Sequence, residues 1–106
     1  MSSLIKDLPS ARAVKATVNA EELIVDLVDG RTIIAPLGWF PRLAHATQRE
    51  RNTWRLIGKG MGIHWPDLDE DISVQNLLLG QSSRESQASL KKWLDGRAGK
   101  KRKAGN

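Results

Sequence analysis

The segment Leu23-Ile-Val-Asp-Leu-Val-Asp-Gly-Arg-Thr-Ile-Ile-Ala35 decides the fold of this chain. Its first half places Leu23, Val25 and Leu27 on one face of an extended strand, which is the pattern of a half-buried β-strand. Asp29-Gly30 follows and is typical of a two-residue hairpin turn, in which both central positions need positive φ. The segment therefore predicts two antiparallel strands joined by a tight turn.

The residues before and after this hairpin extend the sheet and then leave it. Residues 12–18 alternate between two faces and predict a preceding strand. Pro36 ends the last strand, so residues 1–40 predict a three-stranded antiparallel meander. Pro41 suits the first turn of a short helix. Thr47-Gln-Arg-Glu50 has the spacing of a capping box and predicts a second short helix.

A second stretch, Arg55-Leu-Ile-Gly-Lys-Gly-Met-Gly-Ile-His-Trp-Pro-Asp-Leu-Asp-Glu-Asp71, concentrates the unusual residues of the chain. Residues 54–57 and 63–65 predict a short hairpin with a glycine-rich connection. Ser73 then has the position of an N-cap for a helix over residues 74–79.

The last quarter of the chain predicts one helix and a tail. Ser82-Ser-Arg-Glu85 repeats the capping-box spacing and predicts a helix over about residues 83–95, with Gly96 as its stop. Residues 97–106 have little to bury and predict a disordered basic tail. We therefore expect a single α+β domain over residues 1–96, with a small antiparallel sheet (three-stranded meander plus a short hairpin), short helices packed on it and one C-terminal helix.

The net charge of +5 is unevenly distributed along the chain. Residues 1–80 hold nine Lys or Arg and ten Asp or Glu, whereas residues 81–106 hold eight and two. The body is therefore close to neutral. Nonspecific phosphate contact is a possible role only for the tail, through Lys100, Lys101, Arg102 and Lys103.

Composition indicates a cytoplasmic protein with no membrane association. The chain has no cysteine, so disulfides, thiolate metal sites and a thiol nucleophile are excluded. It has no apolar run near the roughly 20 residues that span a bilayer. Its first residues lack the pattern of a secretory signal.

Two patterns in the second stretch invite a chemical interpretation. Gly58-Lys-Gly-Met-Gly62 suggests a phosphate loop, but no Lys-Ser/Thr follows it, so we interpret it as a mobile hairpin connection. The acidic run and His64 suggest a metal site or an acid–base pair, but the spacing of a calcium loop is missing. A surface that faces a partner protein is the favoured interpretation, and no catalytic, cofactor-binding or metal-binding residue is predicted. The predicted partner-binding residues are Trp39, His64, Trp65, Asp67, Asp69, Glu70 and Asp71.

Residues 12–80 resemble the bacterial family catalogued as domain of unknown function 2442. The resemblance rests on unusual strings in the same order, including Pro36-Leu-Gly-Trp-Phe-Pro-Arg-Leu43, Trp54-Arg-Leu-Ile-Gly58 and Gly62-Ile-His-Trp-Pro-Asp-Leu-Asp-Glu-Asp-Ile-Ser73. It implies a small α+β domain and no established activity. Members look like small accessory proteins, often encoded beside another small protein in a toxin–antitoxin-like arrangement. Some carry a helix-turn-helix domain, but this chain has only one predicted helix after Gly80.

The leading hypothesis is therefore a non-catalytic protein-binding module, antitoxin-like or accessory to a small partner protein encoded nearby. The alternative is a nucleic-acid-binding or transcription-regulatory accessory protein that uses the C-terminal helix and basic tail. The two hypotheses differ in salt dependence, because phosphate contacts weaken steeply as salt rises. The oligomeric state does not follow from the sequence.

Overall fold

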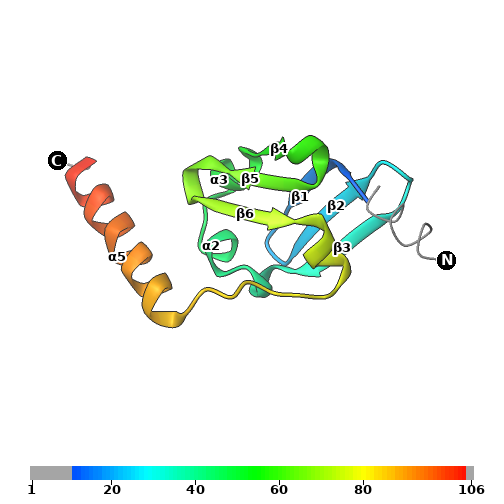
Figure 1. The fold of residues 1–106 in the computed structure, drawn as a ribbon. Coiled ribbons are helices and arrows are strands. Elements are labelled where there is room, and N and C mark those ends of the chain that lie inside the picture. The colour runs from blue at the N-terminus through cyan, green and yellow to red at the C-terminus, as the bar shows by residue number, and fades with distance from the viewer. Residues whose placement is uncertain (1–10, 105–106) are drawn as a thin grey trace.

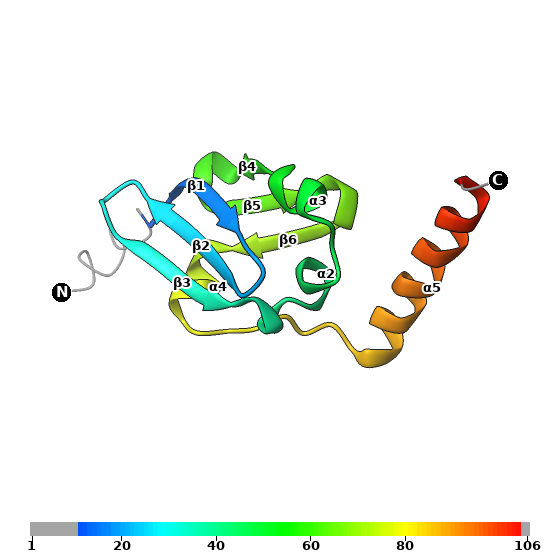
Figure 2. The same cartoon turned by 180° about the vertical axis from the view of Figure 1, so that it is seen from behind.

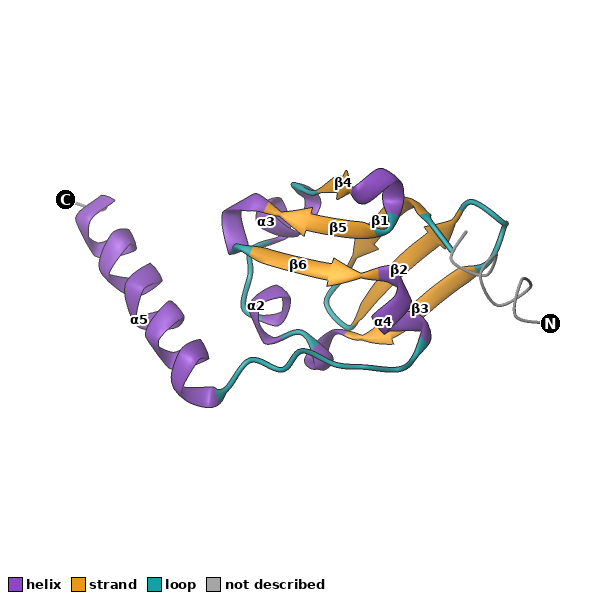
Figure 3. Cartoon of the chain, viewed as in Figure 1, coloured by secondary structure: helices purple, strands orange, loops and turns teal. Residues whose placement is uncertain are grey.

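The computed structural model describes residues 11–104, with side chains up to residue 97. It contains two three-stranded antiparallel sheets with short helices and a longer C-terminal helix (Figures 1 and 3), so the predicted α+β class is confirmed. The first sheet consists of β1 (Ala13–Val18), β2 (Glu22–Leu27) and β3 (Thr32–Pro36), and the second of β4 (Arg55–Ile57), β5 (Gly62–Trp65) and β6 (Glu70–Ser73). The helices are α2 (Pro41–Ala44), α3 (Gln48–Asn52), α4 (Val74–Leu78) and α5 (Gln87–Ala104), and 3₁₀ turns cover Leu37–Trp39, Gly58–Gly60 and Pro66–Leu68. The expected domain also includes residues 1–10, which lie outside the described residues.

The predicted meander is confirmed, and its buried face is the predicted one. β2 lies between β1 and β3, with Val25 opposite Ala16 on one side and Ile33 on the other. Leu23 and Val25 are 0% exposed. Alternation along β2 thus fixes which face of the first sheet turns toward the core.

The turn between β2 and β3 differs from the predicted two-residue form. The Leu27 amide donates to the Arg31 carbonyl at 2.8 Å, which leaves a loop of Val28, Asp29 and Gly30. Only Gly30 has positive φ in this loop (94°). This is the three-residue hairpin with glycine in the left-handed position, and Asp29 stabilises it by accepting the Arg31 amide at 3.1 Å.

The sequence did not reveal β6, which extends the predicted hairpin to a third strand. β6 pairs antiparallel with β5, with Ile72 opposite Ile63 and Asp71 opposite His64. Asp69 makes this pairing possible, because its left-handed backbone (φ 50°) reverses the chain after the turn Pro66–Leu68. Asp tolerates this conformation better than most residues. Because Ile72 is the one apolar residue of β6, its sequence shows little alternation between apolar and polar residues.

The two sheets and the short helices enclose one apolar core. Figure 1 shows the second sheet in front and Figure 2 shows the first sheet from the opposite side. The completely buried side chains come from both sheets and from the segments between them: Leu23, Val25, Leu43, Ile63, Trp65, Leu68 and Val74. The predicted caps also form. Thr47 and Glu50 make the full capping box of α3, and Ser73 accepts the Asn76 amide at the start of α4.

The C-terminal helix begins later and ends later than predicted. Ser86 caps it by accepting the Ser89 amide at 3.1 Å, whereas Ser82 and Ser83 belong to the segment that leads to it. The prediction that Gly96 stops the helix is wrong, because α5 continues to Ala104. Residues 97–104 were expected to be disordered and are helical in the structure. An isolated glycine costs a helix only about 1 kcal/mol, and the residues that follow are mostly strong helix formers.

No helix in the described part of the chain is both long and apolar enough to cross a membrane.

Gly60 lies where the two sheets meet, and its substitution tests that contact. A Cβ atom at Gly60 would lie 2.8 Å from the Ala13 carbonyl oxygen, and its φ is +90°. We expect Gly60→Ala to lower the free energy of unfolding by about 1–3 kcal/mol, measured by urea denaturation. Gly30→Ala is the matched control, because its φ is also positive (+94°) and a Cβ there meets nothing within 4 Å. Equal effects of the two changes would contradict the close approach.

Candidate functional site

The acidic turn, residues 67–71, is held in place by Arg42 of α2. The Arg42 guanidinium donates to the carbonyl oxygens of Leu68 at 3.0 Å and Asp69 at 3.3 Å. It also forms a two-pronged ion pair with Glu85, with the shortest N–O distance at 2.7 Å. Both side chains of this pair are largely buried, at 16% and 10% exposure. One residue thus ties together α2, the acidic turn and the segment that leads to α5.

A second buried ion pair holds α5 against α3. Arg97 donates two hydrogen bonds of 2.9 Å to the carboxylate of Glu50. This contact lowers the pKa of Glu50 to about 2, because the carboxylate accepts from the guanidinium. The Trp93 ring lies 4.6 Å from the Arg97 guanidinium carbon and 5.0 Å from that of Arg42. Cation–π contacts to both arginines therefore add to the ion pairs that position the helix.

Most carboxylates of the acidic turn point into solvent. Asp67 is exposed, and the side chains of Asp69 and Asp71 are 94% and 65% exposed. Glu70 differs, because burial raises its pKa to about 7. The turn therefore presents three exposed carboxylates, whereas Glu70 lies beside a hollow next to β6.

His64 and Asp71 are the predicted site residues that the structure brings into direct contact. They lie opposite each other on β5 and β6, and the His64 Nδ1 atom pairs with the Asp71 carboxylate. Arg55 of β4 lies opposite His64 on the same face. The solvent-exposed Asp69 carboxylate lies 4.0 Å from the Arg42 guanidinium. Among the described side chains, no group of three or more His, Asp or Glu residues is arranged to hold a metal ion.

The two tryptophans predicted to face a partner differ in exposure. Trp65 is 0% exposed, and its indole N–H donates to the Arg51 carbonyl at 3.0 Å. The prediction that Trp65 contacts a partner is therefore wrong, since its strand position alternates with His64 and turns its ring into the core. Trp39 is half-buried against the core, and its carbonyl accepts the Ser83 amide at 2.9 Å.

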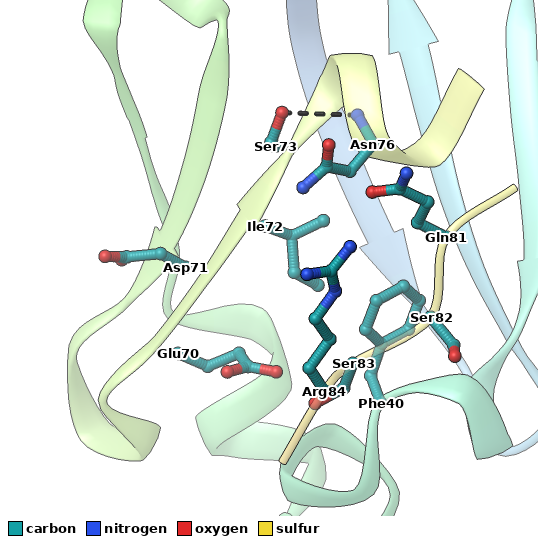
Figure 4. A pocket seen from close by; sticks show the side chains of 10 residues that line it. All are labelled: Phe40, Glu70, Asp71, Ile72, Ser73, Asn76, Gln81, Ser82, Ser83 and Arg84. Atoms are coloured by element: carbon teal, nitrogen blue, oxygen red, sulfur yellow. Dashed lines mark hydrogen bonds between the residues drawn. The ribbon is translucent and has the colours of Figure 1, made fainter. Parts of the chain in front are cut away.

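The hollow beside β6 has a volume of about 170 Å³. Figure 4 shows that its walls are β6, α4 and the segment before α5, with Phe40 between them. Its lining residues are Phe40, Glu70, Asp71, Ile72, Ser73, Asn76, Gln81, Ser82, Ser83 and Arg84. The space accommodates several water molecules and is therefore large enough for a side chain.

Sequence reasoning missed the residues that organise this site. Arg42 and Glu85 are 43 positions apart, and no local pattern connects them. Glu50 was detected only as a capping residue, although it also binds Arg97. The backbone of Lys100, Lys101, Arg102 and Lys103 belongs to α5, but their side chains lie outside the described residues. Their predicted contact with nucleic acid stays a prediction.

These features define a small α+β domain with an appended helix docked through arginine contacts. The chain belongs to the family described as "Protein of unknown function (DUF2442)", whose sequence profile matches residues 11–82. The resemblance inferred from the sequence is thereby confirmed. The matched region ends before α5, so the added helix lies outside the part that defines the family.

Two solved structures are similar to this chain. A protein of unknown function from Rhodospirillum rubrum has 31% sequence identity and a TM-score of 0.61, over 74% of this chain and 95% of that one. The uncharacterised protein CV0863 from Chromobacterium violaceum has 19% identity and a TM-score of 0.62, over 86% of this chain and 85% of that one. The second likeness shows the fold alone. No curated protein matches the chain.

Removing Arg42 tests its role in holding the acidic turn and α5. Arg42→Ala leaves the largely buried Glu85 carboxylate unpaired, so we expect a loss of about 3–5 kcal/mol in the free energy of unfolding. Arg31→Ala is the matched control, because its pair with Asp29 is exposed at 53% and 42% and is worth less than about 1 kcal/mol. Urea denaturation measures both. A loss as small as that of the control would contradict the role of Arg42.

The raised pKa of Glu70 predicts a specific pH dependence of stability. From pH 4.5 to about 7 the folded protein holds a proton that the unfolded chain has released, so this carboxyl lowers stability as the pH rises. We expect Glu70→Gln to melt at a higher temperature than the parent protein above pH 7, with the difference shrinking toward pH 4.5. Thermal unfolding across this range measures it. A difference that is constant with pH would contradict the raised pKa.

Proposed function

We propose that this protein is a non-catalytic binding module, accessory or antitoxin-like, that docks on a small partner protein through the acidic turn. The exposed carboxylates of Asp67, Asp69 and Asp71 are the observation that supports it most directly. Complementary charge on a partner would steer association and fix its orientation. A basic surface is therefore the chemistry expected of the partner.

The rigidity of the turn also supports binding. Arg42 fixes the backbone of Leu68 and Asp69, and Leu68 is 0% exposed. The carboxylates are thus carried by a backbone that is ordered before any partner arrives. A preorganised surface loses less conformational freedom on association, which leaves more of the contact energy as affinity.

The alternative, nucleic-acid binding through α5, stays a second prediction. The helix includes the basic residues 100–103, and its Lys91 and Lys92 side chains are exposed. A helix holds such residues at a fixed spacing along its axis, whereas a disordered tail does not. Steep salt dependence and loss on deletion of residues 97–106 would identify this mode.

Co-expression with the product of the neighbouring gene tests the leading proposal. We expect a complex that co-elutes in size-exclusion chromatography at micromolar concentration. The double change Asp67→Asn and Asp69→Asn should weaken it by about tenfold, measured by calorimetry, and asparagine suits the left-handed position 69.

The matched control removes equal charge elsewhere. Glu21→Gln with Glu22→Gln neutralises one carboxylate in the turn between β1 and β2 and one on the first residue of β2, and should leave affinity nearly unchanged. Separate elution of the two proteins would refute the proposal. Equal weakening by both double changes would refute the role of the acidic turn.

A further inference from the structure

β6 is an edge strand with backbone groups directed away from its only strand neighbour. The second sheet has the order β4-β5-β6, and the Val74 amide donates to the Met61 carbonyl at 3.0 Å at the end of the ladder. Hydrogen-bonded pairs alternate along an antiparallel ladder, so Ile63–Ile72 and Trp65–Glu70 are such pairs. The amide groups of Asp71 therefore point to the open edge, as does the N–H of Ser73. Apart from bonds within the strand ladders, the described chain has no backbone hydrogen bond to the Asp71 amide groups or to the Ser73 N–H.

The hollow described above lies along this open edge, and its far wall is fixed. The Ser83 amide donates to the Trp39 carbonyl and the Gln81 amide to the Asn76 carbonyl, both at 2.9 Å. The Arg42–Glu85 pair holds the same segment further along. Figure 4 shows the side chains of Phe40 and Ile72 in the hollow between this segment and β6. The edge of β6 therefore faces a preformed space.

The other edge strands of the two sheets are β1, β3 and β4, and β3 is less suited to receive a strand. Its outward-facing positions are Thr32 and Ile34, and the strand ends at Pro36. Proline has no amide hydrogen and blunts a sheet edge. The hollow beside β6 is not lined by β3 residues.

Side-chain alternation on β6 specifies the chemistry of an added strand. Asp71 is exposed on the outer face, next to His64, whereas Ile72 turns inward with 5% exposure. An added strand would place alternate side chains beside Asp71 and beside Ile72 and Phe40. A basic side chain complements the Asp71 carboxylate. On the inner side the added strand would meet the apolar side chains of Ile72 and Phe40, which favours an apolar residue there.

We propose that the open edge of β6 receives an extended segment of the partner protein, with alternating basic and apolar residues, as a fourth strand of the second sheet. This inference rests on the proposed function and specifies how the partner is held. Main-chain hydrogen bonds to Asp71 and Ser73 supply affinity, and the alternating side chains supply specificity. The acidic turn adjoins this edge and attracts the same basic partner.

Amide hydrogen exchange with a defined probe tests the inference on the full chain. The probe is a short acetylated peptide of alternating Lys and Val. We expect the exchange of the Asp71 and Ser73 amides, followed by NMR, to slow at saturating peptide. The same peptide with alternate N-methyl groups, which cannot pair along one edge, should lose binding by at least about tenfold. A Glu–Val peptide should bind about tenfold more weakly than Lys–Val.

Two variants at one position separate backbone pairing from charge. Asp71→Pro removes the outward amide hydrogen, and Asp71→Asn removes the charge alone. We expect the proline variant to weaken peptide binding by about tenfold and the asparagine variant by about threefold, with folding checked by circular dichroism. Because the methylated peptide is tested on unmodified protein, misfolding of the proline variant would not decide the result.

The outcomes distinguish this inference from the proposed function. If no Lys–Val peptide binds, or if it binds without slowing the two amides, strand addition is refuted, whereas docking through the acidic turn is judged by the partner complex. If the peptide adds as a strand but the neighbouring gene product forms no complex, the inference stands and that partner is refuted. Equal binding of Glu–Val and Lys–Val peptides would refute a basic occupant.

Discussion

The buried pairing of Arg42 with Glu85 is the contact on which the arrangement of this molecule depends. The guanidinium also binds two backbone carbonyls of the acidic turn and lies near the Trp93 ring. Without it, the hydrogen bonds from the Gln81 and Ser83 amides would still hold the segment before α5, but the acidic turn would lose its hydrogen-bonded anchor. Arginine suits this position because its planar, permanently charged group donates in several directions at once.

The electrostatics of the domain combine two opposite environments for carboxylates. Glu50 and Glu85 face guanidinium groups that lower their pKa values, so both strengthen folding near neutral pH. Among the described side chains, none pairs directly with Glu70, and burial raises its pKa. Natural sequences retain a destabilising buried group mainly where function requires it. The position of Glu70 beside the edge of β6 agrees with that general rule.

The sequence predicted the elements that depend on local patterns and missed those that depend on distant partners. Alternation in β2 and the caps at Thr47 and Ser73 were read correctly, because each signal lies within a few residues. β6 was missed because its pairing depends on the left-handed turn at Asp69. Trp65 was counted among the partner-binding residues although its alternation with His64, on the same face as Ile63, indicates a buried ring. The acidic turn was recognised as exposed, but the arginine that holds it was not.

Arg42 anchors the acidic turn through carbonyl oxygens, which every amino acid possesses. The fold therefore constrains the path of the backbone there far more than the identity of the side chains, apart from the left-handed residue at position 69. Substitutions at the neighbouring exposed positions can change the charge that the turn presents while the supporting scaffold is kept. Related domains built on this fold are thus free to diverge in surface charge at small cost in stability.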